Sequence, residues 1–425
     1  MKLNYKQTLL VGLAFMSING FWQLYDGIIP LMLTNTFNLN ETISGFIMAL
    51  DGILALFLLP YFGSRSDKKQ TRIGKRMPYI LFGTIVAVIL MNIIPVIDNS
   101  YYQSPSTFKL VLFIVILILL LITMCTYRSP AIALMPDITP NPLRSKGNAI
   151  INLMGSVGAI IYLILASILY PRNKIKDLSH VNYQTIFIIF SIIMLIAVII
   201  LFSTINEVKL SKEKQELEKL HPEWNKKSVG VDSSLSKQEK KSLRLLLITI
   251  SLLFMGYSAL TVWFTTYVSK VLQEGLGKAS TCLLIATACA IVSYIPIGNL
   301  STKYGRKKTT MIAISTLVFL FGLAFFTRNI VKSINIPAYI TFGLFGVAWA
   351  TVNVNALPMV LSLCNSNDTG KFTGYYYTAT KSAQIVTPVL AGTLMRLISY
   401  KVLFLYSMIF MILGLITLSQ VKEED

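Results

Sequence analysis

The sequence predicts an all-α integral membrane protein in which twelve transmembrane helices form two six-helix bundles related by pseudo-symmetry. Three observations predict this fold class. Hydrophobic residues make up 54% of the 425-residue chain and charged residues only 13%, which excludes an ordinary soluble domain. Apolar runs near or above about 20 residues, the length that crosses the hydrocarbon core, recur along the chain. One long charged break near the middle divides these runs into two sets of six.

Each predicted span is an apolar run that ends where a short polar turn begins. We expect spans near residues 7–34, 41–62, 78–97, 108–135, 148–170, 183–205, 243–269, 278–300, 309–327, 336–362, 372–395 and 400–420. The first run is long enough to span and contains Asn19, Gln23 and Asp26, so we expect no cleavable signal peptide. The chain is therefore expected to be a multi-pass protein of the cell membrane, with the lipid bilayer as its surroundings.

The net charge of +19 is explained by the positions of the 38 Lys and Arg residues. Most of them fall in the loops and termini on one side of the predicted spans, although residues 171–180 are locally basic on the other side. Because basic loops tend to stay in the cytoplasm, this bias places both termini there. A basic surface for nucleic acid is not needed to explain the charge.

The charged break, residues 206–242, is interpreted as a solvated cytoplasmic linker that is helical through SKEKQELEKL. It separates an N-terminal bundle, residues 1–205, from a C-terminal bundle, residues 243–425. Two loops of the N-terminal bundle have similar counterparts in the C-terminal bundle. LPYFGSRSDKKQTRIGKR corresponds to IPIGNLSTKYGRKK, and ALMPDITPNPLRSKG corresponds to ALPMVLSLCNSNDTGK. Matching loops indicate internal duplication, which is typical of transporters whose substrate site lies between two halves.

The loop after the second span combines glycines, one acid and a basic cluster. Glycine permits a tight turn and close helix approach, and an acid accepts hydrogen bonds from a helix end or an arginine. Basic residues hold such a loop at the cytoplasmic side. We expect a conformational latch here and a matching one after the eighth span. The latch candidates are Gly63, Asp67, Arg72, Gly74, Lys75 and Arg76 in the first loop, and Gly305 and Arg306 in the second.

The first loop resembles the loop between helices 2 and 3 of the major facilitator superfamily, which runs Gly, then Asp with Arg or Lys, then Gly and basic residues. Its long form is similar to that of the sucrose transporters and of the glycoside-pentoside-hexuronide cation symporters, which include the melibiose carriers. The twelve-span plan covers the whole chain, while specific motifs cover the cytoplasmic loops and parts of helices 2, 4, 5 and 11. The resemblance implies the major facilitator fold and secondary active transport.

Four ionisable side chains fall clearly inside predicted spans, where a charge is costly and therefore functional by default. They are Asp26, Asp51, Arg128 and Lys381. Two acids and two bases balance, so we expect them to compensate one another around a common interior. Asp26, Asp51 and Lys381 are the candidates for coupling to a proton or cation. The alternative is a static buried ion pair that only holds helices together.

Polar and aromatic residues at mid-membrane depth are the candidates for a substrate site. Asn19, Gln23 and Asp26 share one face of the first span, because they lie four and three positions apart. Such a face suits a sugar, whose hydroxyls need donors and acceptors and whose ring packs on an aromatic side chain. The candidates are Asn19, Trp22, Gln23, Tyr127, Arg128, Trp349, Asn353, Asn355 and Gln384, with interhelical hydrogen bonding as the alternative role of each amide. Trp263 is expected instead in the interfacial aromatic belt.

Register with the melibiose-type carriers shows both retained and altered positions. Lys381 matches the helix-11 lysine that neighbours their cation site, and Asn152 stands where they have a helix-5 arginine. Leu59 and Ala55 replace two cation-binding aspartates of helix 2, and Arg128 replaces a sugar-contacting aspartate of helix 4. The resemblance therefore implies a retained scaffold with altered substrate chemistry, and it adds Asn152 to the substrate candidates.

Several other chemistries are not expected. The Gly277-Lys278 pair lacks the spaced glycine and the Ser or Thr of a phosphate loop, which argues against ATP-driven transport. The four cysteines, among them Cys364, show no Cys-x-x-Cys spacing, so neither a metal nor a disulfide is implied. We expect no enzymatic activity and no bound cofactor, only a co-transported proton or sodium ion.

The expected function is import of a glycoside or hexuronide together with a proton or cation, by alternating access, in a protein that works as a monomer on a small-molecule substrate. A drug or metabolite exporter would use the same fold in antiport. A lipid-handling carrier would open an apolar side toward the bilayer, and a sensor would bind ligand without flux. The sequence leaves these alternatives open.

Overall fold

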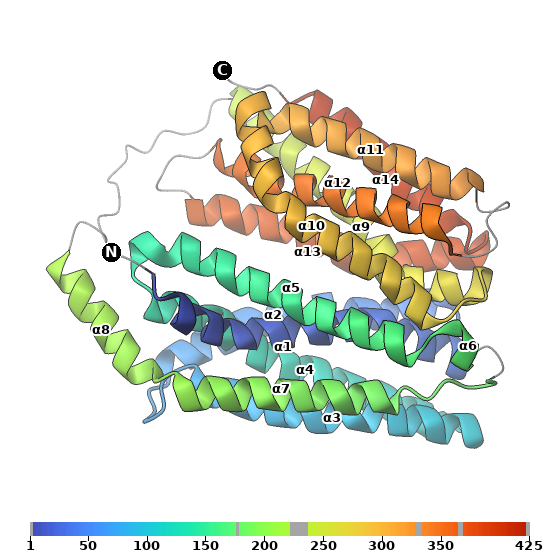
Figure 1. The fold of residues 1–425 in the computed structure, drawn as a ribbon, viewed down its shortest axis with the longest axis horizontal. Helices are drawn as coiled ribbons and strands as arrows, with labels where there is room; N and C mark the ends of the chain where they lie inside the picture. Colours follow the sequence, from blue (N-terminus) through green and yellow to red (C-terminus); the bar gives the residue numbers. More distant parts are fainter. Residues whose placement is uncertain (1–2, 176–177, 222–236, 328–333, 364–368, 422–425) are drawn as a thin grey trace. The chain divides into compact units, whose positions relative to one another are not determined.

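The computed structural model describes residues 3–175, 178–221, 237–327, 334–363 and 369–421, and every regular element in these residues is a helix. Cys364 and part of the loop ALPMVLSLCNSNDTGK lie outside the described residues. The helices, shown in Figure 1, are α1 (Tyr5–Leu31, continued by a π-helix, Met32–Thr36), α2 (Glu41–Lys68), α3 (Met77–Gln103), α4 (Thr107–Ile138), α5 (Arg144–Leu169), α6 (Arg172–Ile175), α7 (Gln184–Thr204), α8 (Glu207–Leu220), α9 (Lys237–Val271), α10 (Leu276–Tyr304), α11 (Arg306–Thr327), α12 (Ile336–Leu361), α13 (Thr369–Leu397) and α14 (Val402–Ser419).

The twelve predicted spans each coincide with one long helix. Eleven helices in the described residues are long and apolar enough to cross a membrane. The remaining predicted span corresponds to α13, which is 29 residues long but carries Lys381, Gln384 and Arg396 and falls short by composition. Apolar length therefore located the helices well, and the exception is a helix that contains two of the polar candidates, Lys381 and Gln384.

The chain divides into two compact units. Unit 1 comprises Met1–Asn38, Leu50–Leu169 and Asp177–Lys226, and unit 2 comprises Leu39–Ala49, Tyr170–Lys176 and Lys227–Asp425. The first turns of α2 thus group with unit 2, which hydropathy alone does not indicate.

Unit 1 is held together by close packing of α1 on α5 and α7, and of α3 on α4 and α7 (Figure 1). The α1–α5 contact depends on small residues: a Cβ atom at Gly158 would collide with the Met16 carbonyl. Backbones that approach this closely exclude larger side chains, as is common between membrane helices. Gly158 is therefore a packing residue.

Unit 2 repeats the same pairings in the same chain order. Helix α9 packs on α13 and α14, and α11 packs on α12 and α14. These pairs correspond to α1 with α5 and α7, and to α3 with α4 and α7. Helix α10 also packs tightly on α12, where a Cβ atom at Gly346 would collide with the Ala286 carbonyl. The repeated pairings agree with the duplication that the matching loops indicate.

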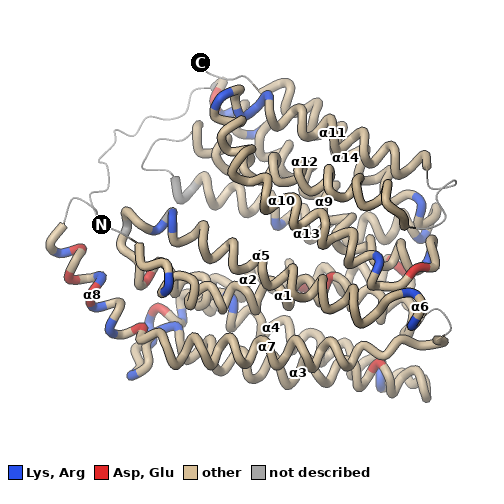
Figure 2. The backbone as a smooth tube through the Cα atoms, viewed as in Figure 1, with Lys and Arg blue, Asp and Glu red and all other residues tan. Residues whose placement is uncertain are grey.

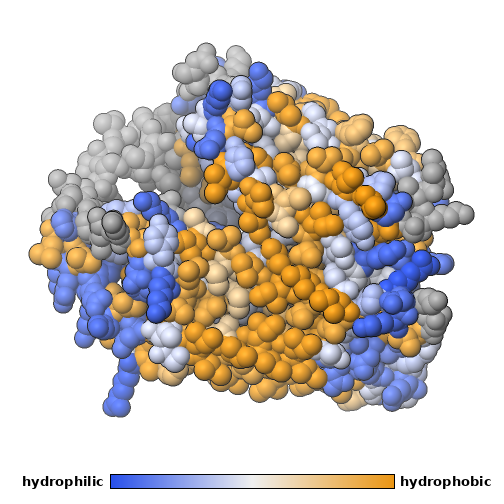
Figure 3. Space-filling view, in the orientation of Figure 1, coloured by the Kyte–Doolittle hydropathy of each residue, from blue (hydrophilic) through white to orange (hydrophobic). Residues whose placement is uncertain are grey.

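The helix surfaces suit a lipid environment. Charged residues gather toward the helix ends, and the middle stretches are mostly uncharged (Figure 2). On α7 the isoleucines at positions 188, 192, 196 and 199 follow helical spacing and are all exposed, and the visible face is largely hydrophobic over the middle of the helices (Figure 3). A soluble helix would place such a stripe toward a core.

Candidate functional site

The first predicted latch folds around the guanidinium of Arg76, which caps the start of α3. Its Nε atom donates to Oδ2 of Asp137 at 2.8 Å, and its other nitrogens donate to Asp67 and to the hydroxyl of Ser66. The Arg76 residue is only 4% exposed. Burial by itself lowers the pKa of Arg76, but the hydrogen bonds and charges of Asp137 and Asp67 outweigh it and raise that pKa. The arginine therefore stays charged while it joins the ends of α2 and α4.

A second set of bonds holds the start of α3. Glu207, the first residue of α8, is buried, and its carboxylate accepts the backbone N–H groups of Lys75, Arg76 and Met77 at 2.7 to 3.1 Å. A helix start carries unpaired N–H groups and the positive end of the helix dipole, so a carboxylate stabilises it. Gly74 has a φ of +115° and lies directly against Glu207, where a Cβ atom would collide. The glycine is thus required at this turn.

Two further candidates of the first loop differ in their surroundings. Gly63 lies beside Ser129 of α4, whose hydroxyl donates to the Leu59 carbonyl at 2.8 Å. The absence of a side chain at Gly63 allows α2 and α4 to approach here. Arg72 is exposed on the turn, and its role in the latch stays a prediction.

Helix α8 is also fixed to the end of α4. Lys214 donates to the Pro136 carbonyl at 3.0 Å, and Arg144 donates to the same carbonyl at 3.2 Å. Cations at a helix C-terminus compensate the unpaired carbonyls and the negative end of the dipole. Burial, and next the charge of Arg144, lowers the pKa of Lys214. The linker segment SKEKQELEKL is helical as predicted, within α8. The linker is not solvated throughout, because the buried Glu207 and the anchored Lys214 join α8 to unit 1.

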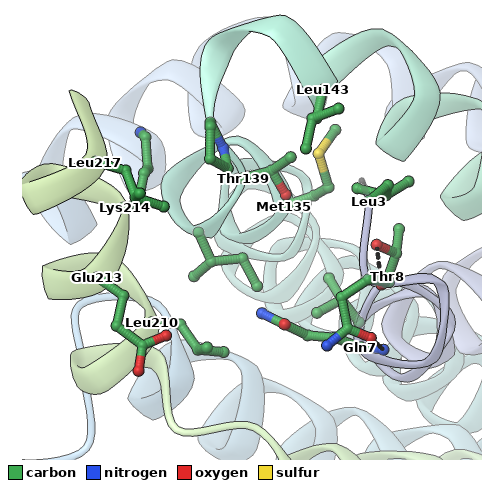
Figure 4. A pocket seen from close by; sticks show the side chains of 14 residues that line it. Leu3, Gln7, Thr8, Met135, Thr139, Leu143, Leu210, Glu213, Lys214 and Leu217 are labelled. Atoms are coloured by element: carbon green, nitrogen blue, oxygen red, sulfur yellow. Dashed lines mark hydrogen bonds between the residues drawn. The ribbon is translucent and has the colours of Figure 1, made fainter. Parts of the chain in front are cut away.

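A cavity of about 140 Å³ lies where α8 meets the start of α1 and the end of α4 (Figure 4). Met135, Leu143, Leu210 and Leu217 are among its apolar walls, and Lys214 is at its edge. The cavity is small compared with ligand pockets of about 300–1,000 Å³. We therefore regard it as a packing defect under α8.

The second latch, in unit 2, uses different contacts at an equivalent place. Gly305 ends α10 with a φ of +88°, and Arg306 begins α11 and is exposed. Lys307 donates to the carbonyls of Ser419 and Val421 at the end of α14, at 3.4 and 2.6 Å. In unit 1 the start of α3 is thus bonded to Glu207, which follows α7 closely. In unit 2 the start of α11 is bonded to the end of α14 and to Val421 just after it. In each unit, the helix after the latch is therefore held by the last long helix of that unit or by residues that follow it.

Three of the four predicted intramembrane charges lie near one aromatic pair in unit 1. The guanidinium of Arg128 lies over the Trp22 ring, 5.4 Å from its centroid. Trp22 meets Tyr25 edge-on, with ring centroids 5.5 Å apart. The carboxylates of Asp26 and Asp51 both act electrostatically on the Tyr25 hydroxyl. We call Trp22, Tyr25, Asp26, Asp51 and Arg128 the aromatic-charge cluster.

The aromatic-charge cluster contains two buried donors without a hydrogen bond. Among the described residues, the indole N–H of Trp22 and the hydroxyl of Tyr25 have no partner. A buried polar group that is left unpaired costs about 1–3 kcal/mol. Two such donors one helical turn apart mark a place where a ligand with acceptor oxygens would be stabilised.

Tyr127 lies next to Arg128 in sequence but points elsewhere. Its side chain is fully buried. Its hydroxyl donates to the Ala14 carbonyl at 3.1 Å and is hydrogen-bonded to Ser17 of α1. This arrangement matches the interhelical alternative, and substrate contact by Tyr127 stays a prediction.

The three amide candidates of unit 1 also have distinct environments. Asn19 packs against Gly155 of α5, and Gln23 is half-buried on the same helix. Asn152 is exposed and donates to the Asn148 carbonyl of its own helix at 2.9 Å. Substrate contact by Asn152 therefore stays a prediction.

Unit 2 contributes an aromatic cluster around Trp349 of α12. The Trp349 ring stacks on Tyr257 of α9 with centroids 3.8 Å apart and planes within 3° of parallel. Phe254 meets Trp349 edge-on at 5.3 Å, and Tyr376 meets Phe254 at 6.5 Å. Sequence reasoning singled out Trp349 but missed Tyr257 and Phe254, since aromatic residues are common in apolar spans and only the fold brings these three together.

The remaining candidates of unit 2 separate into two groups. Lys381 donates to the Gln384 side chain at 2.7 Å, so these two predicted residues form one polar pair on α13. Asn353 donates to a carbonyl of its own helix. Asn355 is 1% exposed and donates to the Ser301 hydroxyl at 2.9 Å. Because two helical positions differ by about 200°, Asn353 and Asn355 face opposite ways.

Asp98 is a buried acid that the sequence did not single out. Asp98 is fully buried near the end of α3, and the Nε2 atom of His180 lies 3.5 Å from its carboxylate. The His180 ring stacks on Tyr102, and its Nε2 lies 2.8 Å from Asn99. Burial lowers the pKa of His180. The sequence did not mark Asp98 as an intramembrane charge, because the third span was predicted to end at residue 97.

The expected interfacial position of Trp263 is wrong. Its ring is fully buried within unit 2, and its Nε1 atom donates to the Pro388 carbonyl at 3.2 Å. The hydropathy profile placed Trp263 near the end of its span, but helix packing covers it. The side chain is a core residue.

Comparison with known proteins assigns the family. Two overlapping matches to the Major Facilitator Superfamily cover residues 11–380 and 277–424. This chain belongs to the major facilitator superfamily. It is therefore a multi-pass membrane protein of a transporter superfamily, and the predicted family and fold are confirmed.

Two curated relatives of this major facilitator protein are named as sugar transporters. The sucrose transport protein SUC3 of Arabidopsis thaliana is 30% identical over 138 residues, which cover 30% of this chain and 23% of that protein. The isoprimeverose transporter of Lactiplantibacillus pentosus is 23% identical over 346 residues, covering 80% of this chain and 67% of that protein. The chain thus matches less than a quarter of SUC3 and about two thirds of the isoprimeverose transporter.

Solved structures support the major facilitator fold alone. A bacterial homologue of the iron transporter ferroportin matches with a TM-score of 0.71 at 12% identity, and the nucleoside transporter NupG with 0.70 at 14% identity. The matches cover 99% or more of this chain and 100% of each of those chains. At such identities the likeness says nothing about what this chain carries.

Proposed function

We propose that this major facilitator protein imports a sugar, a glycoside or a hexuronide, together with a proton or a cation by alternating access. The observation that carries the proposal is the aromatic-charge cluster. An aromatic face, unpaired donors, a guanidinium and two carboxylates are the groups that hold a polar, ring-shaped ligand. The names of both relatives, sucrose and isoprimeverose transporters, favour sugar over other polar cargo.

The cluster suggests a division of roles. The Trp22 ring would pack on the apolar face of a sugar ring, and its N–H with the Tyr25 hydroxyl would donate to sugar oxygens. Arg128 would bind a hydroxyl, or a uronate carboxylate in bidentate fashion. Because Arg128 stands where melibiose-type carriers have an acid, an acidic sugar is the variant to test first.

Coupling is proposed to act through Asp26 and Asp51 in unit 1, with Lys381 and Gln384 as the polar pair of unit 2. Binding of a proton or sodium ion to an acid changes its charge and so biases the equilibrium between inward and outward states. Asn19, Gln23, Trp349 and Asn353 remain further proposed substrate contacts. The basic loops are proposed to face the cytoplasm together with both termini, and the monomer to be the working unit.

Solid-supported-membrane electrophysiology on reconstituted protein tests the proposal. Neutral disaccharides and uronides are added in turn, with and without sodium, at two pH values, and uptake of labelled sugar is followed in parallel. We expect one sugar class to evoke a current that an ionophore for one ion abolishes. Arg128→Lys keeps the charge but loses the planar fork, so it should weaken uronide transport more than that of neutral sugars.

Protein that is shown to be folded, yet gives neither current nor sugar uptake, would contradict the proposal. Net efflux of the sugar under an inward ion gradient would instead establish an exporter. Either result leaves the family assignment intact, because that assignment does not depend on the substrate.

A further inference from the structure

A groove on the surface of unit 2 leads to a cluster of basic side chains. It has a volume of about 570 Å³ and is lined by one face each of α10, α11 and α12. Its rim is apolar and open: Leu300, Ile312 and Leu344 are 49%, 60% and 50% exposed. Its lining on α11 runs from Lys308 to Thr316, which is about 12 Å at the helical rise per residue. We call it the α10–α11 groove.

The polar atoms inside the α10–α11 groove are used by the protein itself. The Thr309 hydroxyl donates to the Gly305 carbonyl at 3.0 Å, and the Thr351 hydroxyl donates to the Val347 carbonyl at 3.0 Å. Ser301 accepts from Asn355 at 2.9 Å. These bonds leave few polar groups for a ligand along the walls. The groove therefore suits an apolar occupant.

The end of the groove carries positive charge without compensating acids on its walls. Lys308 lines the groove and is exposed, and Lys303 and Arg306 lie on either side of the junction where α10 ends and α11 begins. Helices α10, α11 and α12 contain no acidic residue. In the described residues Lys308 makes no ion pair, whereas the neighbouring Lys307 is bound to α14. An anionic group at this end would meet several basic side chains.

We propose that the α10–α11 groove binds an anionic phospholipid, with one acyl chain along the groove and the phosphate at Lys308. An acyl chain fills apolar space that the three helices leave open, and a phosphate pairs with exposed basic side chains at a membrane surface. Tyr304, which lines the same end of the groove, is the amphipathic residue that favours the headgroup level. The lipid is a resident ligand of unit 2, separate from the transported substrate.

Native mass spectrometry of the detergent-purified full chain tests this site without any transport assay. Phosphatidylglycerol and phosphatidylcholine with identical acyl chains are titrated separately. Val347→Trp fills the groove, and Ile340→Trp places the same ring on the same helix face two turns away and outside the groove. Lys308→Ala removes the proposed phosphate partner, and Lys212→Ala removes an exposed lysine of α8 as its control.

We expect phosphatidylglycerol to bind more tightly than phosphatidylcholine, Val347→Trp to remove one bound lipid, and Lys308→Ala to weaken phosphatidylglycerol binding about fivefold. Both controls should bind as the original chain does. Unchanged binding in folded Val347→Trp protein would overturn the site. Equal binding of the two lipids, or an unchanged affinity in Lys308→Ala, would overturn the anionic headgroup. None of these outcomes depends on the proposed sugar transport.

Discussion

At the scale of single residues, the position of Arg128 over the Trp22 ring differs from that of an arginine held in a salt bridge. A guanidinium over an indole face is stabilised by cation–π attraction of about 0.5–2 kcal/mol while its donors remain available to a ligand. A short, closed salt bridge would leave fewer donors available. The Arg76 side chain illustrates that contrast, since its nitrogens are occupied by Asp67, Ser66 and Asp137. This difference supports the proposed role of Arg128 in substrate binding, whereas Arg76 holds the ends of α2 and α4 together.

Neutralising Asp51 should abolish accumulation of the sugar against its gradient but leave its exchange across the membrane. Asp51→Asn removes the charge that a proton or cation would bind, so the gradient could no longer drive uptake. We expect the sugar ratio across the membrane to fall to about 1, the value for simple equilibration, while exchange of internal for external sugar continues. Counterflow and net-uptake assays on the same proteoliposomes measure the two quantities. Asp51→Glu, which keeps a carboxylate, should retain part of the accumulation.

Normal accumulation by Asp51→Asn would remove Asp51 from the mechanism. Loss of both exchange and uptake, with the protein folded, would show that Asp51 supports the site rather than the coupling.

At the scale of elements, the sequence predicted what depends on local composition. The long helices follow from apolar length, and the latch glycines from their need for special turns and close approach. The partners of these elements were not predictable, because they depend on contacts far apart in the chain. Glu207 reaches residues about 130 positions earlier, and Tyr127 reaches Ser17 of α1. Asn355 of α12 donates to Ser301 of α10, which matches the interhelical alternative, and its contact with substrate stays a prediction.

Glu207 should stabilise the start of α3 through its charge. A hydrogen bond to a charged acceptor contributes about 1.5–3 kcal/mol and one to a neutral acceptor about 0.5–1.5 kcal/mol. Glu207→Gln keeps one acceptor oxygen but loses the charge, so we expect a stability loss of about 1 kcal/mol or more. Thermal unfolding followed by intrinsic fluorescence in detergent measures it.

Glu216→Gln provides the matched control, because Glu216 lies on α8 and is exposed. Gly74→Ala should destabilise as well, since its Cβ atom would displace the same carboxylate and its φ is unfavourable for alanine. Equal midpoints for Glu207→Gln and Glu216→Gln would show that Glu207 contributes nothing to folding.

At the scale of the whole molecule, the one predicted span that falls short by composition, α13, decides the topology. With twelve spans both termini lie on the same side of the membrane, and with eleven they lie on opposite sides. Helix α13 carries Lys381 and Gln384, which bond each other and so reduce the cost of placing them in the membrane. Close packing on α9 offers α13 a protein surface in place of lipid along one face. Both effects favour insertion of a helix whose composition alone would not ensure it.

Reporter fusions in a bacterial host test this topology. We expect a fluorescent protein fused after Asp425 to be fluorescent, since it folds in the cytoplasm, and alkaline phosphatase fused after Tyr400 to be active, since the chain has then crossed α13. A fluorescent protein fused after Leu363 should also be fluorescent and serves as the cytoplasmic control. If α13 did not cross, the patterns at Tyr400 and Asp425 would both reverse while the Leu363 control stayed the same. That outcome would leave Lys381 outside the membrane and remove it from the proposed coupling site.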